Sequence, residues 1–340
     1  MCKNLSTFAK ISSSRWEELK KKIHMLEITY LAAVIVVVFL SIRASYYIDM
    51  LEKTTNLSGA FLGGVLLSAI TSLPELFTSI TAVLYVDKPG LCISNILGSD
   101  IFNSMILAVL VILFIRRFSK ARITEGNKRV TFFVLVTFFL ISVNCFFPFS
   151  RYTIPYIGVN ILTIFIIIVY AVGVKYLASD PKTSTQQKVE TSFSNRKLVL
   201  RFVAVSLGII ASSIFLTLIA DKIAVKYSLG EGLAGAIFLG VATSLPEVAS
   251  TAALFKIGNF NAAVGNIVGS NLFNFLVLCI ADFICLYSET YDYTDLDVRE
   301  IVQYGLLSCM FLLSMFLFRK KLMKVLMAIG VIVAYVMFLF

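Results

Sequence analysis

Long apolar runs, separated by short charged or turn-rich breaks, fill almost the whole chain. Ten of these runs are long enough to cross a hydrocarbon core of about 30 Å as helices. They cover residues 27–44, 58–86, 90–115, 130–148, 153–174, 198–220, 231–255, 260–286, 300–318 and 322–340. Because they leave no room for a separate soluble domain, the pattern predicts an all-α membrane protein with ten transmembrane helices.

The two halves of the chain resemble each other. Residues 63–82 align with residues 235–254, and both contain the pentapeptide TSLPE. The stretch NILGSDIFN at 95–103 aligns in the same way with NIVGSNLFN at 266–274. These copies begin on the second and the seventh apolar runs, an odd number apart, so successive crossings give them opposite orientations. The sequence therefore predicts two inverted-topology five-helix repeats, an architecture typical of transporters, with the site where the repeats meet near the bilayer midplane.

The longest polar break separates the two predicted repeats. Its Ser, Thr and Gln residues and its Asp-Pro pair are typical of a flexible linker. The predicted organisation is an N-terminal tail, a first five-helix repeat, a linker and a second five-helix repeat, at residues 1–26, 27–178, 179–197 and 198–340.

Composition and charge agree with a membrane protein. Hydrophobic residues make up 59% of the 340 residues and charged residues 15%, and the mean hydropathy is +0.90. The net charge of +10 comes from Lys and Arg clusters at the ends of apolar runs, so they anchor helices and do not indicate nucleic-acid binding. Most of these charges lie on the linker side, which predicts a cytoplasmic linker and an outside N-terminus. Because Lys20, Lys21 and Lys22 oppose that orientation, Met25 is expected to be the true start.

Two glutamates stand in the middle of apolar runs. Glu75 shares one predicted helix face with Ser68, Thr71 and Ser72, at intervals of three and four residues. The second repeat places Gly240, Thr243, Ser244, Glu247, Ser250 and Thr251 in the same pattern. A charged carboxylate at the bilayer centre costs roughly 2.5–3.5 kcal/mol, so both glutamates are expected to face each other or a cation. Pro74 and Pro246 each free a backbone carbonyl about one turn earlier, which adds oxygen ligands.

The following apolar runs add further oxygen-bearing side chains. Asn95, Ser99 and Asn103 recur every fourth residue, as do Asn266, Ser270 and Asn274 in the second repeat. Gly98 and Gly269 are expected to let a neighbouring helix approach closely. Carboxylates, hydroxyls, amides and carbonyls together suit calcium and sodium and lack the sulfur and imidazole that zinc or copper prefers.

An enzyme is not expected from this sequence. The single histidine, His24, lies outside the apolar runs, and neither a GxSxG stretch nor a CxxC pair is present. The residues therefore offer no His-based triad and no zinc motif, and no cofactor is expected.

The doubled motifs resemble those of the calcium/cation antiporter superfamily, in which a TSxPE-type motif precedes a GSN-type motif. Here they are TSLPE at 71–75 and 243–247, then GSD at 98–100 and GSN at 269–271. The resemblance implies side-chain cation ligands, together with backbone carbonyls at Ser68 and Gly240. The implied side chains are Thr71, Ser72, Glu75, Ser99, Asn103, Thr243, Ser244, Glu247, Ser270 and Asn274.

Two positions separate this chain from other members of the superfamily. Several members have an aspartate where this chain has Asn274. In the potassium-dependent exchangers that aspartate is tied to potassium, so the resemblance implies that the asparagine argues against potassium coupling. Asp100 stands where an uncharged residue is usual. It is expected to be a buried acid with a local hydrogen bond, Asn103 being three residues away, and the alternative is a supporting partner of the ligands.

The resemblance implies sodium/calcium exchange by alternating access, in which the first and sixth spans slide past a stationary core. Proton/calcium relatives carry GNxxE-type motifs, which makes proton coupling the alternative; a cation channel and a membrane scaffold are further alternatives. The expected partners are calcium, sodium and the lipid bilayer of a plasma or inner membrane, with a monomer sufficient for transport.

Overall fold

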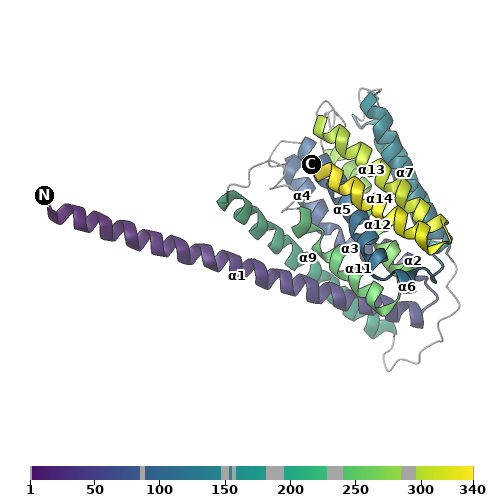
Figure 1. Cartoon of the computed structure of the whole chain (residues 1–340), viewed down its shortest axis with the longest axis horizontal. Coiled ribbons are helices and arrows are strands. Elements are labelled where there is room, and N and C mark those ends of the chain that lie inside the picture. Colours follow the sequence, from purple (N-terminus) through teal and green to yellow (C-terminus); the bar gives the residue numbers. More distant parts are fainter. Residues whose placement is uncertain are drawn as a thin grey trace.

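The protein is described here from a computed structural model, which covers residues 2–84, 89–146, 153–154, 158–180, 195–227, 240–284 and 296–339. Within those ranges the chain is almost entirely helical and has nine helices long and apolar enough to cross a membrane (Figure 1). Eight of them are α1 (Cys2–Thr54), α5 (Pro89–Leu113), α7 (Glu125–Phe146), α8 (Ile161–Ala178), α9 (Asn195–Lys226), α12 (Phe260–Ile284), α13 (Leu296–Leu317) and α14 (Lys321–Leu339), and the ninth is the span Gly59–Thr81. The prediction of an all-α membrane protein is confirmed.

The second span, which carries the first glutamate, is broken into short pieces. It consists of α2 (Gly59–Phe61), the π-helical segment η1 (Leu62–Leu67), α3 (Ser68–Thr71) and α4 (Leu73–Leu84). The break falls at Ser72, whose φ of −91° and ψ of 5° leave the helical region just before Pro74. The cause is local, because a proline cannot donate to the carbonyl four residues earlier.

The seventh span repeats this break. Its helix α11 (Leu245–Ile257) starts after Ser244, which has a φ of −84° and a ψ of 6° and precedes Pro246. The first part of the predicted span 231–255 lies outside the described residues. In the described part of this span, the TSLPE motif thus interrupts the helix at the same position as in the first repeat.

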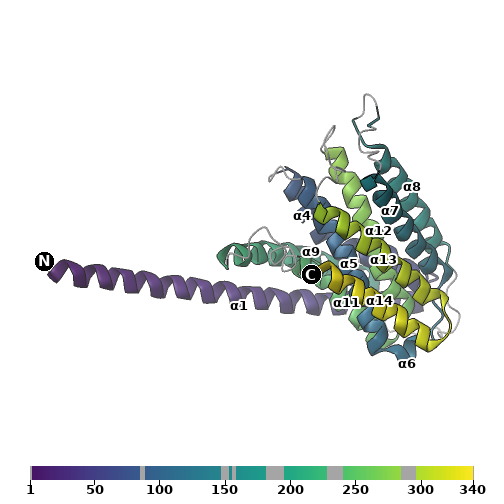
Figure 2. The ribbon, with the colours of Figure 1, turned by 45° about the horizontal axis from the view of Figure 1, so that its top comes forward.

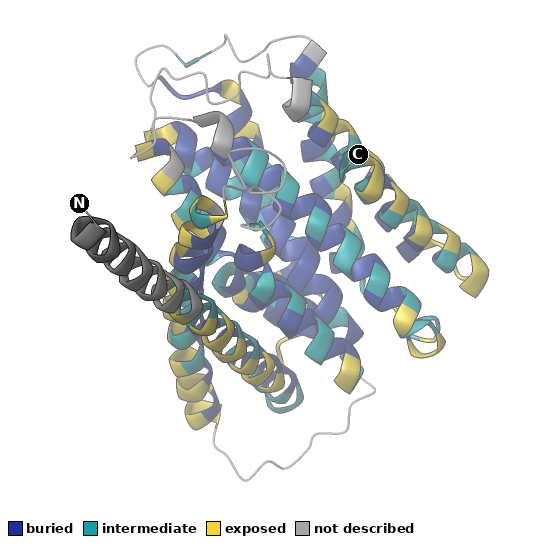
Figure 3. Ribbon diagram, turned by 60° about the vertical axis from the view of Figure 1, so that its left-hand side comes forward, coloured by how far each residue is buried: buried dark blue, intermediate teal, exposed yellow. Residues whose placement is uncertain are grey.

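Helix α12 is the centre of the bundle. It packs against η1, α5, α11, α7 and α8, and it is lined by buried residues along most of its length (Figures 2 and 3). A Cβ added at Gly269 would lie 2.1 Å from the Gly64 carbonyl oxygen, and one at Gly63 would lie 2.1 Å from that of Ala262. Glycine is required at both points because the backbones of η1 and α12 touch there.

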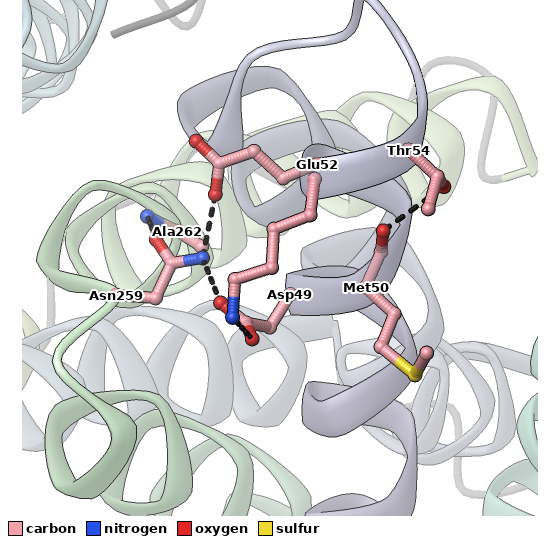
Figure 4. Close-up of polar contacts among 7 residues, drawn as sticks. Asp49, Met50, Glu52, Thr54, Asn259 and Ala262 are labelled. Atoms are coloured by element: carbon pink, nitrogen blue, oxygen red, sulfur yellow. Dashed lines mark hydrogen bonds and ion pairs between the residues drawn. The ribbon is translucent and has the colours of Figure 1, made fainter. Parts of the chain in front are cut away.

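Helices α1 and α9 pack against each other and flank the rest of the bundle (Figure 1). One end of α1 is tied to the core by two buried acids (Figure 4). The Asn259 amide nitrogen donates to Asp49 Oδ1 at 3.0 Å and to Glu52 Oε2 at 2.6 Å. Glu52 Oε1 also accepts from the Gly59 amide at 3.0 Å, and Asn259 Oδ1 accepts from the Ala262 amide at 3.2 Å. This cluster joins α1 to the start of α2 and of α12.

Several predicted boundaries are corrected by the structure. Helix α1 continues past residue 44 to Thr54, and in the other direction it runs through the predicted tail to Cys2. The fifth span was expected from residue 153, but α8 begins at Ile161. Asn160 stands before it with extended backbone and accepts from the Leu162 amide at 2.9 Å, while Gly158 has a φ of 74°. This N-cap geometry makes the helix begin later than hydropathy alone indicates.

Candidate cation-binding site

The two predicted glutamates are buried and hydrogen-bonded crosswise between the repeats. Glu75 is 1% exposed and Glu247 is 0% exposed. The Ser244 hydroxyl donates to Glu75 Oε1 at 3.0 Å, and the Ser72 hydroxyl donates to Glu247 Oε1 at 2.9 Å. Each serine stands at the helix break of its own repeat and supports the carboxylate of the other. The site is therefore built by both halves of the chain.

The second oxygen of each carboxylate has no hydrogen-bond partner. Among the described residues, fourteen buried side-chain atoms lack a partner, and eight of them belong to the motif residues of the two repeats. They are Glu75 Oε2, Ser99 Oγ, Asp100 Oδ2, Asn103 Oδ1, Glu247 Oε2, Asn266 Oδ1, Ser270 Oγ and Asn274 Oδ1. All are oxygens. An unsatisfied buried polar atom costs free energy, and this concentration of oxygens could hold a cation.

The two asparagines that end the motifs are also paired crosswise. Asn103 donates through Nδ2 to Asn271 Oδ1 at 3.2 Å, and Asn274 donates through Nδ2 to Asp100 Oδ1 at 2.8 Å. Residues 100 and 271 occupy the same position of the two repeats. The amide nitrogens are thereby used within the protein, and the carbonyl oxygens stay unpartnered.

The predicted threonine and carbonyl ligands take part in helix hydrogen bonds. The Thr71 hydroxyl donates to the Ser68 carbonyl oxygen at 3.2 Å, and the Thr243 hydroxyl donates to that of Gly240 at 3.0 Å. Each of these carbonyls also accepts from the backbone amide four residues later, at 3.0 Å. These two hydroxyls and two carbonyls thus lie at the breaks of their helices. A cation that bound them would compete with hydrogen bonds inside the protein.

A second pair of asparagines joins neighbouring helices beside the site. Asn266 donates to the hydroxyls of Ser250 and Thr251 at 3.0 and 2.9 Å, which ties α12 to α11. In the first repeat Asn95 donates to Thr78 at 3.1 Å, which ties α5 to α4. These contacts fix the helix that carries each glutamate against the helix that carries the following motif.

The structure corrects the expectation for Asp100. Its carboxylate was expected to bond locally to Asn103, but it accepts from Asn274 of the other repeat. Sequence position alone suggested a neighbour on the same helix, whereas the crossing of α5 and α12 brings the partner from 174 residues away. The internal repeat contained a signal for this pairing. Residues 100 and 271 occupy the same position of the two repeats, as do residues 103 and 274, so the contact of Asn103 with Asn271 has its counterpart in the contact of Asn274 with Asp100.

Close helix approach is confirmed at Gly269 but not at Gly98. Within the part of the chain that the structure describes, nothing lies within 4 Å of a Cβ at Gly98.

A contact between α1 and the helix that carries Glu247 was not predicted from the sequence. The Ser45 hydroxyl donates to the Ser250 carbonyl oxygen at 2.9 Å, so α1 touches α11 one turn beyond Glu247. Ser41, one turn earlier on α1, is buried as well. The spacing of four residues between two hydroxyls in an apolar run was the available signal.

An inverted-repeat helical bundle whose two halves meet at a pair of buried carboxylates is an arrangement typical of membrane transporters. The family described as "Sodium/calcium exchanger protein" matches residues 27–174 and 197–340, nearly the whole chain. The protein belongs to this family, whose members exchange cations.

Named relatives and solved structures agree with that membership. The chain is 23% identical to the inner membrane protein YrbG of Escherichia coli over 256 residues, covering 73% of this chain and 76% of the relative. It is 27% identical to the uncharacterized membrane protein MJ0091 of Methanocaldococcus jannaschii over 233 residues, covering 66% and 70%. A structure of the sodium-calcium exchanger NCX_Mj, soaked with Na⁺ and Sr²⁺, matches with a TM-score of 0.70 at 18% identity, covering 92% of this chain and 97% of that one. The structural match establishes the fold.

Proposed function

We propose that the protein exchanges sodium for calcium by alternating access at a midplane site centred on Glu75 and Glu247. The observation that carries the proposal is the crosswise pair of carboxylates, each held through one oxygen by a serine of the other repeat and left with a second, unpartnered oxygen. Two like charges in a buried site are mutually unfavourable. A divalent cation between them, or sodium ions in its place, removes that cost.

The ligand set favours calcium and sodium over softer metals. The unpartnered atoms are carboxylate, amide and hydroxyl oxygens, which suit hard cations that accept six to eight oxygen ligands. The predicted ligands are Glu75, Glu247, Thr71, Ser72, Thr243, Ser244, Ser99, Asn103, Ser270 and Asn274, with the carbonyls of Ser68 and Gly240. Overlapping use of these oxygens by the two ions would make their binding competitive, which exchange requires.

Alternating access is supported by an unequal packing of the two flanking helices. Helix α1 is tied to the core by the Asn259 cluster and packs extensively along α11. Its counterpart α9 contacts α4 less extensively, and Asp221, which aligns with Asp49, is exposed. The side of the bundle at the C-terminal end of α1 is thus closed more tightly. In the opposite state of the transport cycle, α1 would separate from α11 and α9 would pack more closely against α4.

The orientation follows from the distribution of basic residues. The linker of residues 179–197 is proposed to be cytoplasmic and the N-terminus outside, in a plasma or inner membrane, which places the tied end of α1 on the cytoplasmic side. The name of the relative YrbG also specifies an inner membrane protein. One chain supplies both halves of the site, so a monomer is sufficient for transport.

The test is calcium uptake into proteoliposomes that contain the purified protein. Vesicles loaded with sodium and diluted into sodium-free medium with ⁴⁵Ca²⁺ are expected to accumulate calcium, while vesicles with equal sodium on both sides are not. Uptake that follows a pH gradient and ignores sodium would favour proton coupling. Uptake that merely runs down the calcium gradient would favour a channel. Loss of uptake in E75Q and E247Q is expected, and exchange retained in either variant would refute the site.

A further inference from the structure

Four side chains form one continuous network where α5 and α12 cross. Asn103 donates to Asn271 Oδ1, and the Asn271 amide nitrogen donates in turn to the Asp100 carbonyl oxygen at 3.1 Å and to the Ser104 hydroxyl at 3.3 Å. Asn274 donates to the Asp100 carboxylate at 2.8 Å. Asp100, Asn103, Asn271 and Asn274 are all buried, with at most 1% of their surface exposed. Asp100 therefore accepts a hydrogen bond from Asn271 at its backbone carbonyl and another from Asn274 at its carboxylate.

This network decides which end of each amide faces the ion site. An asparagine offers a carbonyl oxygen on one side and an NH₂ group on the other, and the two ends are interchangeable unless a neighbour distinguishes them. A carboxylate oxygen accepts, so it selects the NH₂ end of Asn274. Asn271 is held with its own NH₂ on Asp100 and Ser104, so its oxygen selects the NH₂ end of Asn103. Both remaining Oδ1 atoms are buried and unpartnered.

The geometry points to Asp100 as a positioning residue for ion binding. Its carboxylate holds the Asn274 amide so that Oδ1 is presented to the cation, and Asn271 does the same for Asn103. This inference rests on the proposed function, because it assigns a role to residues that surround the proposed ligands. Without an acceptor at position 100, Asn274 is free to turn its NH₂ group toward a cation, which repels it.

The first test is equilibrium binding of ⁴⁵Ca²⁺ to the purified full-length protein. D100L keeps the branched shape of the side chain and removes the acceptor, so we expect its Kd for calcium to rise about tenfold. D100N keeps an acceptor oxygen of the kind that Asn271 already provides in the other repeat. The Kd of D100N for calcium is therefore expected to stay within about threefold of the wild-type Kd. Equal weakening by D100N and D100L, or no weakening by D100L, would overturn the inference.

A double-mutant cycle separates positioning from a general structural effect. If Asp100 acts through Asn274, then D100L added to N274A weakens calcium binding little further, because the amide to be oriented is already absent. Additive losses would overturn the inference.

D100N also covers the case in which D100L does not fold. Because it keeps the shape of the side chain and an acceptor for Asn274, and leaves the Asn271 donor in place, its Kd is expected to stay within about threefold of the wild type, and a tenfold rise would overturn the inference. The two proposals fail distinguishably. Wild-type protein that binds no calcium contradicts the proposed function, whereas wild-type binding combined with tight binding by D100L contradicts only the role of Asp100.

Discussion

Gly269→Ala is expected to destabilise the bundle at the contact between α12 and η1. The added Cβ would lie 2.1 Å from the Gly64 carbonyl oxygen and 2.6 Å from its Cα, both of them backbone atoms. Since ordinary contact starts near 3.4 Å, the two helices would have to separate by more than 1 Å. Overpacking of this kind costs about 1–3 kcal/mol, and the helix preference of alanine over glycine returns at most about 1 kcal/mol. The expected net loss is about 1–2 kcal/mol.

The assay is thermal unfolding of the detergent-purified variant, read by loss of the monodisperse peak in size-exclusion chromatography. Gly208→Ala is the matched control, because it is the same change in membrane helix α9, where the Cβ meets only the flexible end of Leu40, at 3.0 Å. G269A should unfold at a lower temperature than the wild type, and G208A should not. A wild-type unfolding temperature for G269A, or a larger drop for G208A, would refute the close backbone contact.

Three further substitutions test other parts of the structure. Asn160→Ala removes the N-cap of α8 and should lower the free energy of unfolding by about 1 kcal/mol, measured by chemical denaturation. Asn259→Ala removes two hydrogen bonds to buried carboxylates of α1 and should cost about 2–3 kcal/mol in the same assay; an unchanged midpoint would contradict the tie. Ser72→Ala and Ser244→Ala each remove one crosswise bond to a glutamate, so both should weaken calcium binding by a similar factor of about ten, measured by isothermal titration.

Hydropathy and the internal repeat predicted most of the architecture from the sequence. Long apolar runs locate transmembrane helices because the bilayer tolerates little else. The repeat then located the candidate site, since Glu75 and Glu247 are acids that recur in identical context within those runs. Both glutamates are buried together, as expected.

The remaining features depend on contacts that no local pattern contains. The partner of Asp100 comes from the other repeat, and only the crossing of two helices brings it near. Asp49 and Glu52 follow the end of the predicted first span, where acids are usually solvated. Both are nevertheless buried, and both accept hydrogen bonds from Asn259. The start of α8 is the exception, because the cap at Asn160 is a local signal that hydropathy alone does not detect.

The central claim is that sodium and calcium share one site between Glu75 and Glu247. The most direct measurement is ⁴⁵Ca²⁺ binding to the purified protein at increasing sodium concentration, with E75Q and E247Q alongside. Sodium should displace calcium completely from the wild type, and each variant should lose calcium binding. Calcium binding that persists at saturating sodium, or that survives in either variant, would contradict the claim.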